Sequence, residues 1–236
     1  MKDTSRKRLH SNRAEFFAGV LNELPLLLGV FPFGMIYGIL ALQAFLPPIA
    51  AQAMSSLIFA GSAQFISAQL LGQGVPMIVL VGTVFIVNLR HMLYSASIAP
   101  YTRHLSKKWK AILAYFLTDE AYVIAIAHYN EDTPVDRKHW YFLGAGFTLW
   151  FGWQVASAAG IFLGAQVPPS WSLDFALALT FIALVVPALK DKPAVAAALT
   201  AGIVALAAYP LPFKLGLIIA AFAGIASGLI CERLWR

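Results

Sequence analysis

The sequence predicts an all-α integral membrane protein, and three observations lead to this fold class. Only 12% of the 236 residues are charged and 60% are hydrophobic, whereas a soluble domain carries about 25% charged residues. Apolar runs such as residues 24–46, 77–99 and 140–167 reach the ~20 residues that a helix needs to span a bilayer. The chain lacks the short alternating segments of a membrane barrel, so helices are the expected spanning elements.

Basic residues gather in two short stretches of the chain, whose formal net charge is +6. The first stretch contains Lys2, Arg6, Lys7, Arg8 and Arg13, and the second contains Arg103, Lys107, Lys108 and Lys110. Beside apolar spans, such clusters mark the cytoplasmic side of a membrane, and we prefer this interpretation to nucleic-acid binding. The single cysteine, Cys231, excludes an internal disulfide.

Proline, glycine and charged residues divide the chain into eight apolar segments. These are residues 24–46, 54–71, 77–101, 111–128, 140–167, 173–189, 194–209 and 213–231. If all eight crossed and the N-terminus were cytoplasmic, the second basic cluster would lie outside, against the positive-inside rule. We therefore expect six full crossings plus two re-entrant or broken helices, which are the second and sixth segments.

An internal repeat supports this count. Three landmarks recur in the same order: Leu28-Gly29 as Leu143-Gly144, Pro47-Pro48 as Pro168-Pro169, and Phe59-Ala60 as Phe175-Ala176. An odd number of crossings in each half makes the halves inverted copies, a plan in which the broken segments of transporters meet at the membrane midplane.

The expected domains follow from this repeat. They are a basic cytoplasmic N-terminal segment (1–22), a first membrane repeat (23–129), an extracytoplasmic loop (130–139) and a second, inverted membrane repeat (140–236). Both termini are then cytoplasmic, and the chain is a multi-pass protein of the cytoplasmic (inner) membrane. In this arrangement Glu23 is expected to lie at a membrane entrance, as an interfacial group.

The first candidate site lies in residues 59–65 (FAGSAQF), which are unusually small and polar for membrane depth. Gly61 and Ser62 favour a local break, and the N–H groups from Gly61 to Gln64 could then hold a carboxylate. Ser62, Phe65 and Gln69 share one helical face, which continues the polar path. Close packing of small residues between helices is the alternative.

The second candidate site combines polar side chains of the third and fourth segments. Asn88 and His91 share one helical face, Arg90 lies on another, and Asp119-Glu120 interrupts the next apolar run. An ionised group at the bilayer centre costs at least ~2.5 kcal/mol, so these groups should be paired, neutral or hydrated.

A helical rise of ~1.5 Å per residue puts Arg90 about 18 Å before the loop between the two segments and Asp119 about 14 Å after it. The two charges should therefore lie at similar depth. Asn88 and Asp119 are candidates for substrate binding. Arg90, His91, Asp119 and Glu120 are candidates for an ion pair or for coupling. A purely structural ion pair and a hydrogen-bonded core histidine are the alternatives.

Three motifs resemble those of the AzlC family of branched-chain amino-acid exporters: residues 59–65 (FAGSAQF), 88–94 (NLRHMLY) and 117–121 (LTDEA). The resemblance covers the chain from about Leu24 to its end. It implies export of valine, leucine, isoleucine and sometimes methionine across the bacterial inner membrane, driven by ion or proton exchange. It also implies a small, separately encoded membrane partner of the AzlD type, so this chain resembles the large subunit.

An apolar amino acid would need a carboxylate site, an ammonium site and an apolar pocket. Gly61 to Gln64 offer N–H donors, Asp119 or Glu120 offers the anion, and Phe65, Phe181 and Leu184 offer apolar walls. A passive channel, a membrane scaffold and an intramembrane serine hydrolase that uses Ser62 with His91 are the rival interpretations. No catalytic residue, metal or cofactor is expected, and the sequence lacks a nucleotide-binding motif.

Overall fold

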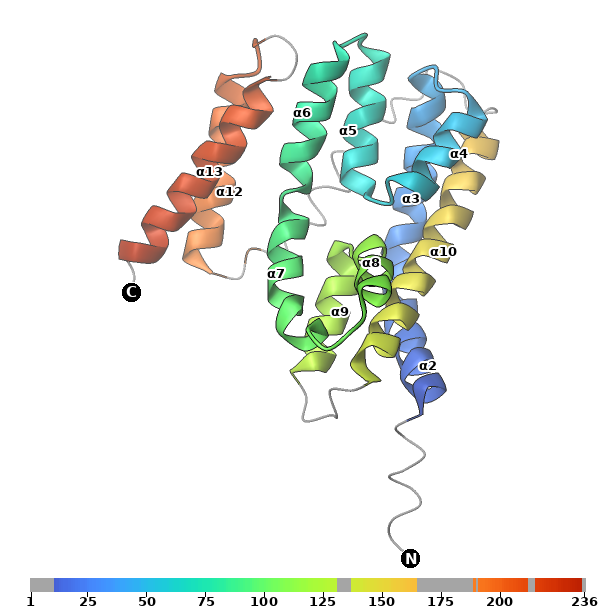
Figure 1. The fold of residues 1–236 in the computed structure, drawn as a ribbon. Coiled ribbons are helices and arrows are strands. Elements are labelled where there is room, and N and C mark those ends of the chain that lie inside the picture. The colour runs from blue at the N-terminus through green and yellow to red at the C-terminus, as the bar shows by residue number, and fades with distance from the viewer. Residues whose placement is uncertain (1–10, 131–136, 165–188, 190, 212–214, 235–236) are drawn as a thin grey trace, which may run out of the picture. The chain divides into compact units, whose positions relative to one another are not determined.

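The computed structural model describes residues 11–130, 137–164, 189, 191–211 and 215–234, and every regular element among them is a helix. The elements are α2 (Asn12–Glu23), η1 (Leu24–Leu26), α3 (Leu27–Gln43), α4 (Pro48–Leu57), α5 (Gly61–Gly72), α6 (Met77–Asn88), α7 (Arg90–Thr102), α8 (Lys107–Tyr115), α9 (Asp119–Tyr129), α10 (Lys138–Gly164), α12 (Lys192–Ala207) and α13 (Leu215–Leu234) (Figure 1). The all-helical prediction is therefore confirmed for the described part of the chain.

Among the described residues, four helical stretches are long and apolar enough to cross a membrane. They are Asn12–Gln43, Met77–Thr102, Lys138–Leu163 and Leu215–Leu234. The first stretch begins well before residue 24, where the sequence placed the first apolar segment, because Ser11 caps α2 by accepting a hydrogen bond from the Ala14 N–H. Part of the expected N-terminal segment is thus helical.

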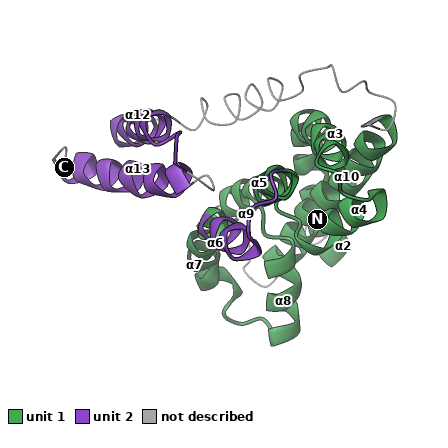
Figure 2. Cartoon of the chain, turned by 90° about the horizontal axis from the view of Figure 1, so that it is seen from above, with its two compact units in different colours: residues 1–72, 87–169 green, residues 73–86, 170–236 purple. Residues whose placement is uncertain are grey.

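The chain forms two compact units, shown in different colours in Figure 2. Unit 1 contains Met1–Gly72 and Val87–Pro169, and unit 2 contains Gln73–Ile86 and Ser170–Arg236. In unit 2, α12 and α13 pack antiparallel through small residues, with Gly224 against Ala201, and Thr200 donates a hydrogen bond of 2.9 Å to Ser227.

Unit 1 is built around two parallel rods, α2–η1–α3 and α10 (Figure 1). Glycines let the two backbones approach closely: a Cβ on Gly38 would lie 2.5 Å from the backbone nitrogen of Ile161, and one on Gly34 would lie 2.7 Å from Cβ of Ala156. Small-residue contacts of this kind are typical of helix packing in membranes. The rods form the frame that holds the remaining helices.

The helices α4 and α5 form a hairpin, which we call the first hairpin. Their apolar stretch is broken at residues 58–60, where Phe59 has a φ of 34°, a left-handed conformation that is strained for a non-glycine residue. Both outer ends lie where α3 ends, since a Cβ on Gly72 would lie 3.1 Å from that of Ala44. The first hairpin therefore enters and leaves unit 1 at one end (Figure 1).

The helices α8 and α9 form a second hairpin at the other end of unit 1. The break lies at residues 116–118, and Thr118 caps α9 by accepting a hydrogen bond from the Ala121 N–H. Its outer ends lie where α7 ends: Tyr101 donates a hydrogen bond of 2.9 Å to Asn130, and Lys110 bonds the Arg103 carbonyl. The two hairpins thus enter from opposite ends of the unit.

The second hairpin differs from the sequence-based expectation of one crossing segment over residues 111–128. At ~1.5 Å per residue, α8 and α9 are about 14 and 17 Å long, short of the ~30 Å apolar core of a bilayer. Residues 103–110 and Asn130 consequently lie at the same end of unit 1, whereas the expected topology separates them. The sixth expected segment (173–189) lies almost entirely outside the described residues, as do Pro168-Pro169, Phe175-Ala176, Phe181 and Leu184.

Candidate functional site

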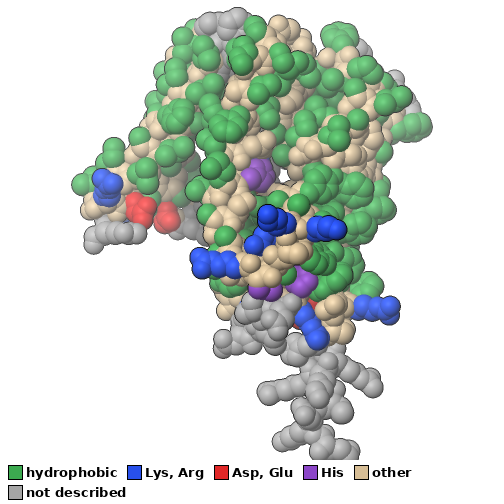
Figure 3. Space-filling view, viewed as in Figure 1, with side chains coloured by type: hydrophobic (Ala, Val, Ile, Leu, Met, Phe, Trp, Pro, Cys, Tyr) green, Lys and Arg blue, Asp and Glu red, His purple; other side chains and the backbone are tan. Residues whose placement is uncertain are grey.

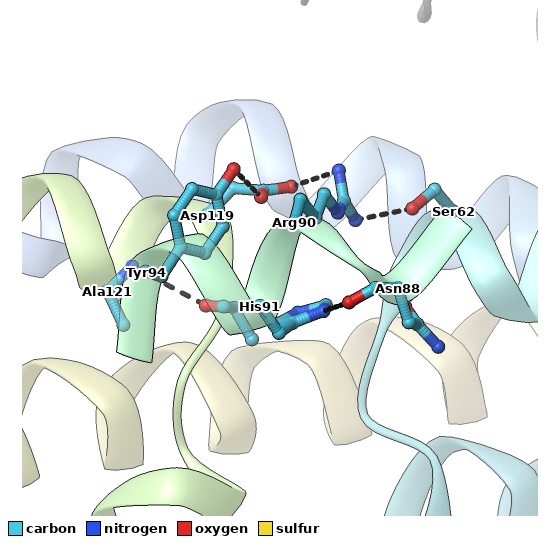
Figure 4. A network of polar contacts seen from close by, with 8 residues as sticks. Ser62, Asn88, Arg90, His91, Tyr94, Asp119 and Ala121 are labelled. Carbon is cyan, nitrogen blue, oxygen red and sulfur yellow. Dashed lines mark hydrogen bonds and ion pairs between the residues drawn. The ribbon is translucent and has the colours of Figure 1, made fainter. Parts of the chain in front are cut away.

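Arg90 connects the two hairpins at the middle of unit 1. It is the first residue of α7, and its guanidinium donates a hydrogen bond to Ser62 Oγ, at the start of α5. The other side of the guanidinium pairs with Asp119, at the start of α9, with an Nη1–Oδ2 distance of 2.6 Å (Figure 4). The structure therefore brings Ser62, Arg90 and Asp119 together.

Asp119 is oriented by a second contact from α7. The Tyr94 hydroxyl donates a hydrogen bond of 2.7 Å to Asp119 Oδ1, and the Tyr94 ring stacks on Tyr122 with 4.4 Å between centroids. Tyr94 lies one turn after Arg90, so both side chains reach Asp119 from the same face of α7 (Figure 4). One carboxylate oxygen thus contacts the guanidinium and the other contacts the phenol.

Two helices begin around this ion pair, α5 at Gly61 and α9 at Asp119, whereas α7 continues the helical stretch of α6 through Leu89. The first N–H groups of a helix have no partner within that helix, and the helix start carries a partial positive charge. Together with the guanidinium, these helix starts favour an anion. Asp119 supplies a negative charge beside them, so the site can match both ends of a zwitterion.

Gly61 lies against an aromatic cluster. A Cβ built on Gly61 would lie 3.0 Å from the Trp153 ring and 3.1 Å from the Phe33 ring. Phe33 also stacks on Phe65 at 4.4 Å, and Tyr37 packs against Trp153 at 6.0 Å. These four rings are buried, so they form an apolar wall directly beside the start of α5.

Gln64, another expected substrate-binding residue, faces away from the Arg90–Asp119 pair. Its amide donates a hydrogen bond of 3.0 Å to Ser55, which in turn bonds Ser157 at 3.0 Å. These bonds tie α5 to α4 and α10. Gln69 is half-buried two turns further along α5.

Asn88 and His91 lie close to the ion pair but do not join it. The His91 ring nitrogen Nδ1 lies 3.2 Å from the Asn88 carbonyl (Figure 4), while Asn88 Oδ1 is buried without a partner among the described residues. Glu120 follows Asp119 directly and is half-buried. The rival hydrolase needs Ser62 beside His91, yet these side chains bond Arg90 and the Asn88 carbonyl instead.

Sequence reasoning missed several polar residues that support the site. Gln154 of α10 accepts hydrogen bonds of 2.9 Å from Gln52 and Ser56 of α4 and donates to the Ser55 carbonyl. The spacing of Gln154 and Ser157 within an apolar run was an available signal, because it places both on one helical face. Glu23, expected at an interface, is completely buried.

Comparison with known proteins places the chain in a family. Residues 25–167 match the family described as AzlC protein. The chain belongs to the AzlC family. The matched region contains every candidate site residue, from Gly61 to Glu120.

Three relatives extend the similarity to most of the chain. Inner membrane protein YgaZ of Escherichia coli (strain K12) is 25% identical over 92% of this chain and 89% of its own length. A membrane protein of Archaeoglobus fulgidus is 30% identical over 91% and 94%. Branched-chain amino acid transport protein AzlC of Bacillus subtilis (strain 168) is 31% identical over 76% and 70%. No solved structure matches.

Proposed function

We propose that this AzlC-family membrane protein is the large subunit of a secondary transporter that exports branched-chain and related apolar amino acids from the cytoplasm. The observation that carries this proposal is the Arg90–Asp119 ion pair at the starts of α5 and α9. The name of the Bacillus subtilis relative supports an amino-acid substrate.

The roles follow from the chemistry of the substrate. The N–H groups at the start of α5, with Ser62, receive the carboxylate, and Asp119 receives the ammonium group. In the empty site, Arg90 neutralises Asp119, which lowers the cost of a charge in the membrane. The rings of Phe33, Phe65 and Trp153 provide the apolar surface that a branched side chain needs.

The end of unit 1 where α7 and α8 meet is proposed to be cytoplasmic. Arg103, Lys107, Lys108 and Lys110 are all exposed there, and Figure 3 shows basic side chains gathered below a largely hydrophobic surface. The positive-inside rule assigns such an end to the cytoplasm. Because Asn130 lies at the same end, we now also place the loop at residues 130–139 on the cytoplasmic side.

The domain boundaries remain a proposal, with one revision. We keep 23–129 and 140–236 as the two membrane parts. We also keep a cytoplasmic C-terminus, which requires the sixth expected segment (173–189) to be a full crossing, because residues 111–128 no longer count as one. An inverted repeat that relates those two parts requires residues 111–128 to cross the membrane. We propose instead an inverted repeat within unit 1. One copy is α3 with the first hairpin, and the other is α7 with the second hairpin.

The proposal has two further parts. Transport is coupled to an ion or proton gradient, which concentrates the substrate, and the chain works with a small AzlD-type membrane partner. Counterflow of radiolabelled leucine in proteoliposomes that contain the chain and its co-purifying subunits tests the function. A carrier exchanges labelled for unlabelled leucine and transiently accumulates the label. A passive channel equilibrates the label without accumulation, and a scaffold moves none, so either result contradicts the proposal.

A further inference from the structure

Glu23 is a buried carboxyl group that the proposed substrate site does not use. It is the last residue of α2, its side chain has 0% exposure, and neither carboxylate oxygen has a hydrogen-bond partner among the described residues. It lies within the candidate membrane span Asn12–Gln43. Burying an unpaired carboxylate is costly, and such a group takes up a proton instead.

The packing of α2 on α9 identifies the group that faces Glu23. The two helices are antiparallel neighbours, and Glu15 of α2 contacts His128 of α9 at 3.1 Å. Glu23 follows Glu15 by eight residues, and Glu120 precedes His128 by eight residues, about 12 Å in each helix. The antiparallel register therefore places Glu120 at the level of Glu23.

The other titratable groups on the helices packed against α2 lie toward the end of the unit. From α10, these are Tyr141, which accepts a hydrogen bond of 2.7 Å from Asn22, and Lys138 and His139 in its first turn. Lys138 donates to the Tyr129 carbonyl, and His128 stacks on Tyr141 at 3.8 Å. From α9, Asp119 is paired with Arg90. Glu120 is thus the carboxyl group left to face Glu23.

We propose that Glu23 and Glu120 hold one proton between them and form the proton-coupling site of the transporter, beside the Arg90–Asp119 substrate site. Two carboxylates that face each other in a weakly polar interior do not both ionise, so one proton is retained. Because Glu120 adjoins Asp119, binding of the substrate ammonium at Asp119 favours the charged form of Glu120 and releases the proton.

This assignment rests on the proposed function, so its test needs a readout of the proton itself as well as transport. Wild type, Glu23→Gln and Glu120→Gln are reconstituted, and leucine exchange, leucine accumulation under a pH gradient and the luminal pH are measured. Glu232→Gln, at an exposed carboxyl of α13, is the matched control. Infrared spectroscopy of the same samples reports the carbonyl band of a protonated carboxyl near neutral pH.

We expect Glu23→Gln to exchange leucine within about threefold of wild type but to lose the accumulation of about tenfold per pH unit that exchange for one proton provides. It should also lose the protonated-carboxyl band, while Glu232→Gln behaves as wild type. Accumulation by Glu23→Gln at the wild-type level, or absence of the band in wild type, would overturn the coupling site. If wild type has the band but does not exchange leucine, the proposed function fails instead.

Discussion

The two hairpins of unit 1 have the same form and different chemistry. Each consists of two short helices with both outer ends at one end of the unit, and each begins its second helix beside Arg90. The first hairpin brings small, neutral groups to that point, Gly61 and Ser62, whereas the second brings Thr118 and two acids, Asp119 and Glu120. The same arrangement of two short helices thus supplies hydrogen-bond donors from the first hairpin and negative charge from the second.

The hairpins also differ in how firmly unit 1 holds them. Six residues of α5 between Ala63 and Leu70 are buried, and α4 is tied to α10 by Gln154. In the second hairpin, α9 buries Ala121, Ala125 and Tyr129, but α8 buries only Leu113. Regions with fewer buried contacts open at lower free energy, so we expect the second hairpin to move during transport and the first to remain fixed.

Among changes to polar side chains, the largest effect is expected from removing the charge of the second hairpin. Asp119→Asn should reduce leucine exchange about 10- to 150-fold, since a charge-assisted contact to the substrate is worth ~1.5–3 kcal/mol and the amide cannot replace it. It should also lower the free energy of unfolding by about 1–2 kcal/mol, because Arg90 loses its partner in a pair that is about a third exposed. Exchange assays and thermal unfolding in detergent measure the two effects.

The double variant Arg90→Gln/Asp119→Asn separates a substrate site from a structural pair. We expect it to recover stability, because no unpaired charge remains, but not exchange. Recovery of both would show that the pair only supports the fold, and we would then abandon Asp119 as the ammonium site.

The first hairpin should be most sensitive at Gly61. Gly61→Leu is expected to abolish exchange, because its side chain must displace the rings of Phe33 and Trp153, and Gly61→Ala should reduce exchange about tenfold with the protein still folded. Gly29→Leu is the matched control, since a Cβ on Gly29 would meet no atom within 4 Å. Near-normal exchange by Gly61→Leu would place the carboxylate site elsewhere.

The sequence predicts the first hairpin better than the second. The small residues of 59–65 predict a break, and the structure has one there. The break at 116–118 was not anticipated, because Phe116-Leu117-Thr118 contains neither glycine nor proline and Thr118 acts as a cap only in its folded setting. Helical spacing put Arg90 and Asp119 at similar depth, and the structure pairs them.

The burial of Glu23 could not be read from the sequence for a related reason. The apolar run begins at Leu24, which places Glu23 at its edge. In the structure, however, α2 continues the same rod and packs against α9 and α10. These tertiary contacts decide which face of α2 is buried, and no local sequence pattern predicts them.

A smaller effect is expected at Ser62, the neutral counterpart of Asp119. Ser62→Ala removes one hydrogen bond to Arg90 and one candidate donor to the substrate, so exchange should fall about three- to tenfold. Measured as a Michaelis constant for leucine, the change should appear as weaker binding. A loss as severe as that of Asp119→Asn would contradict the division of roles between the hairpins.

The smallest effect is expected where the hairpins touch outside the site. The Tyr115 hydroxyl of α8 donates to the Ser56 carbonyl of α4 and accepts a hydrogen bond of 2.7 Å from Trp150. Tyr115→Phe should lower the unfolding free energy by about 1 kcal/mol and change exchange less than about threefold. A larger loss of exchange at unchanged stability would mean that this contact takes part in the transport movement.

The most direct test of opposed hairpins is the side of the membrane on which Asn130 lies. In a Cys231→Ser background, Ser106→Cys, Asn130→Cys and Gln43→Cys are each treated with an impermeant maleimide in intact cells and in inverted vesicles. Because the second hairpin returns to the end it entered, Ser106→Cys and Asn130→Cys should both react only from the cytoplasmic side, and Gln43→Cys, at the exposed end of α3, only from outside. Reaction of Asn130→Cys from outside intact cells would show that residues 111–128 cross the membrane and would contradict the opposed arrangement.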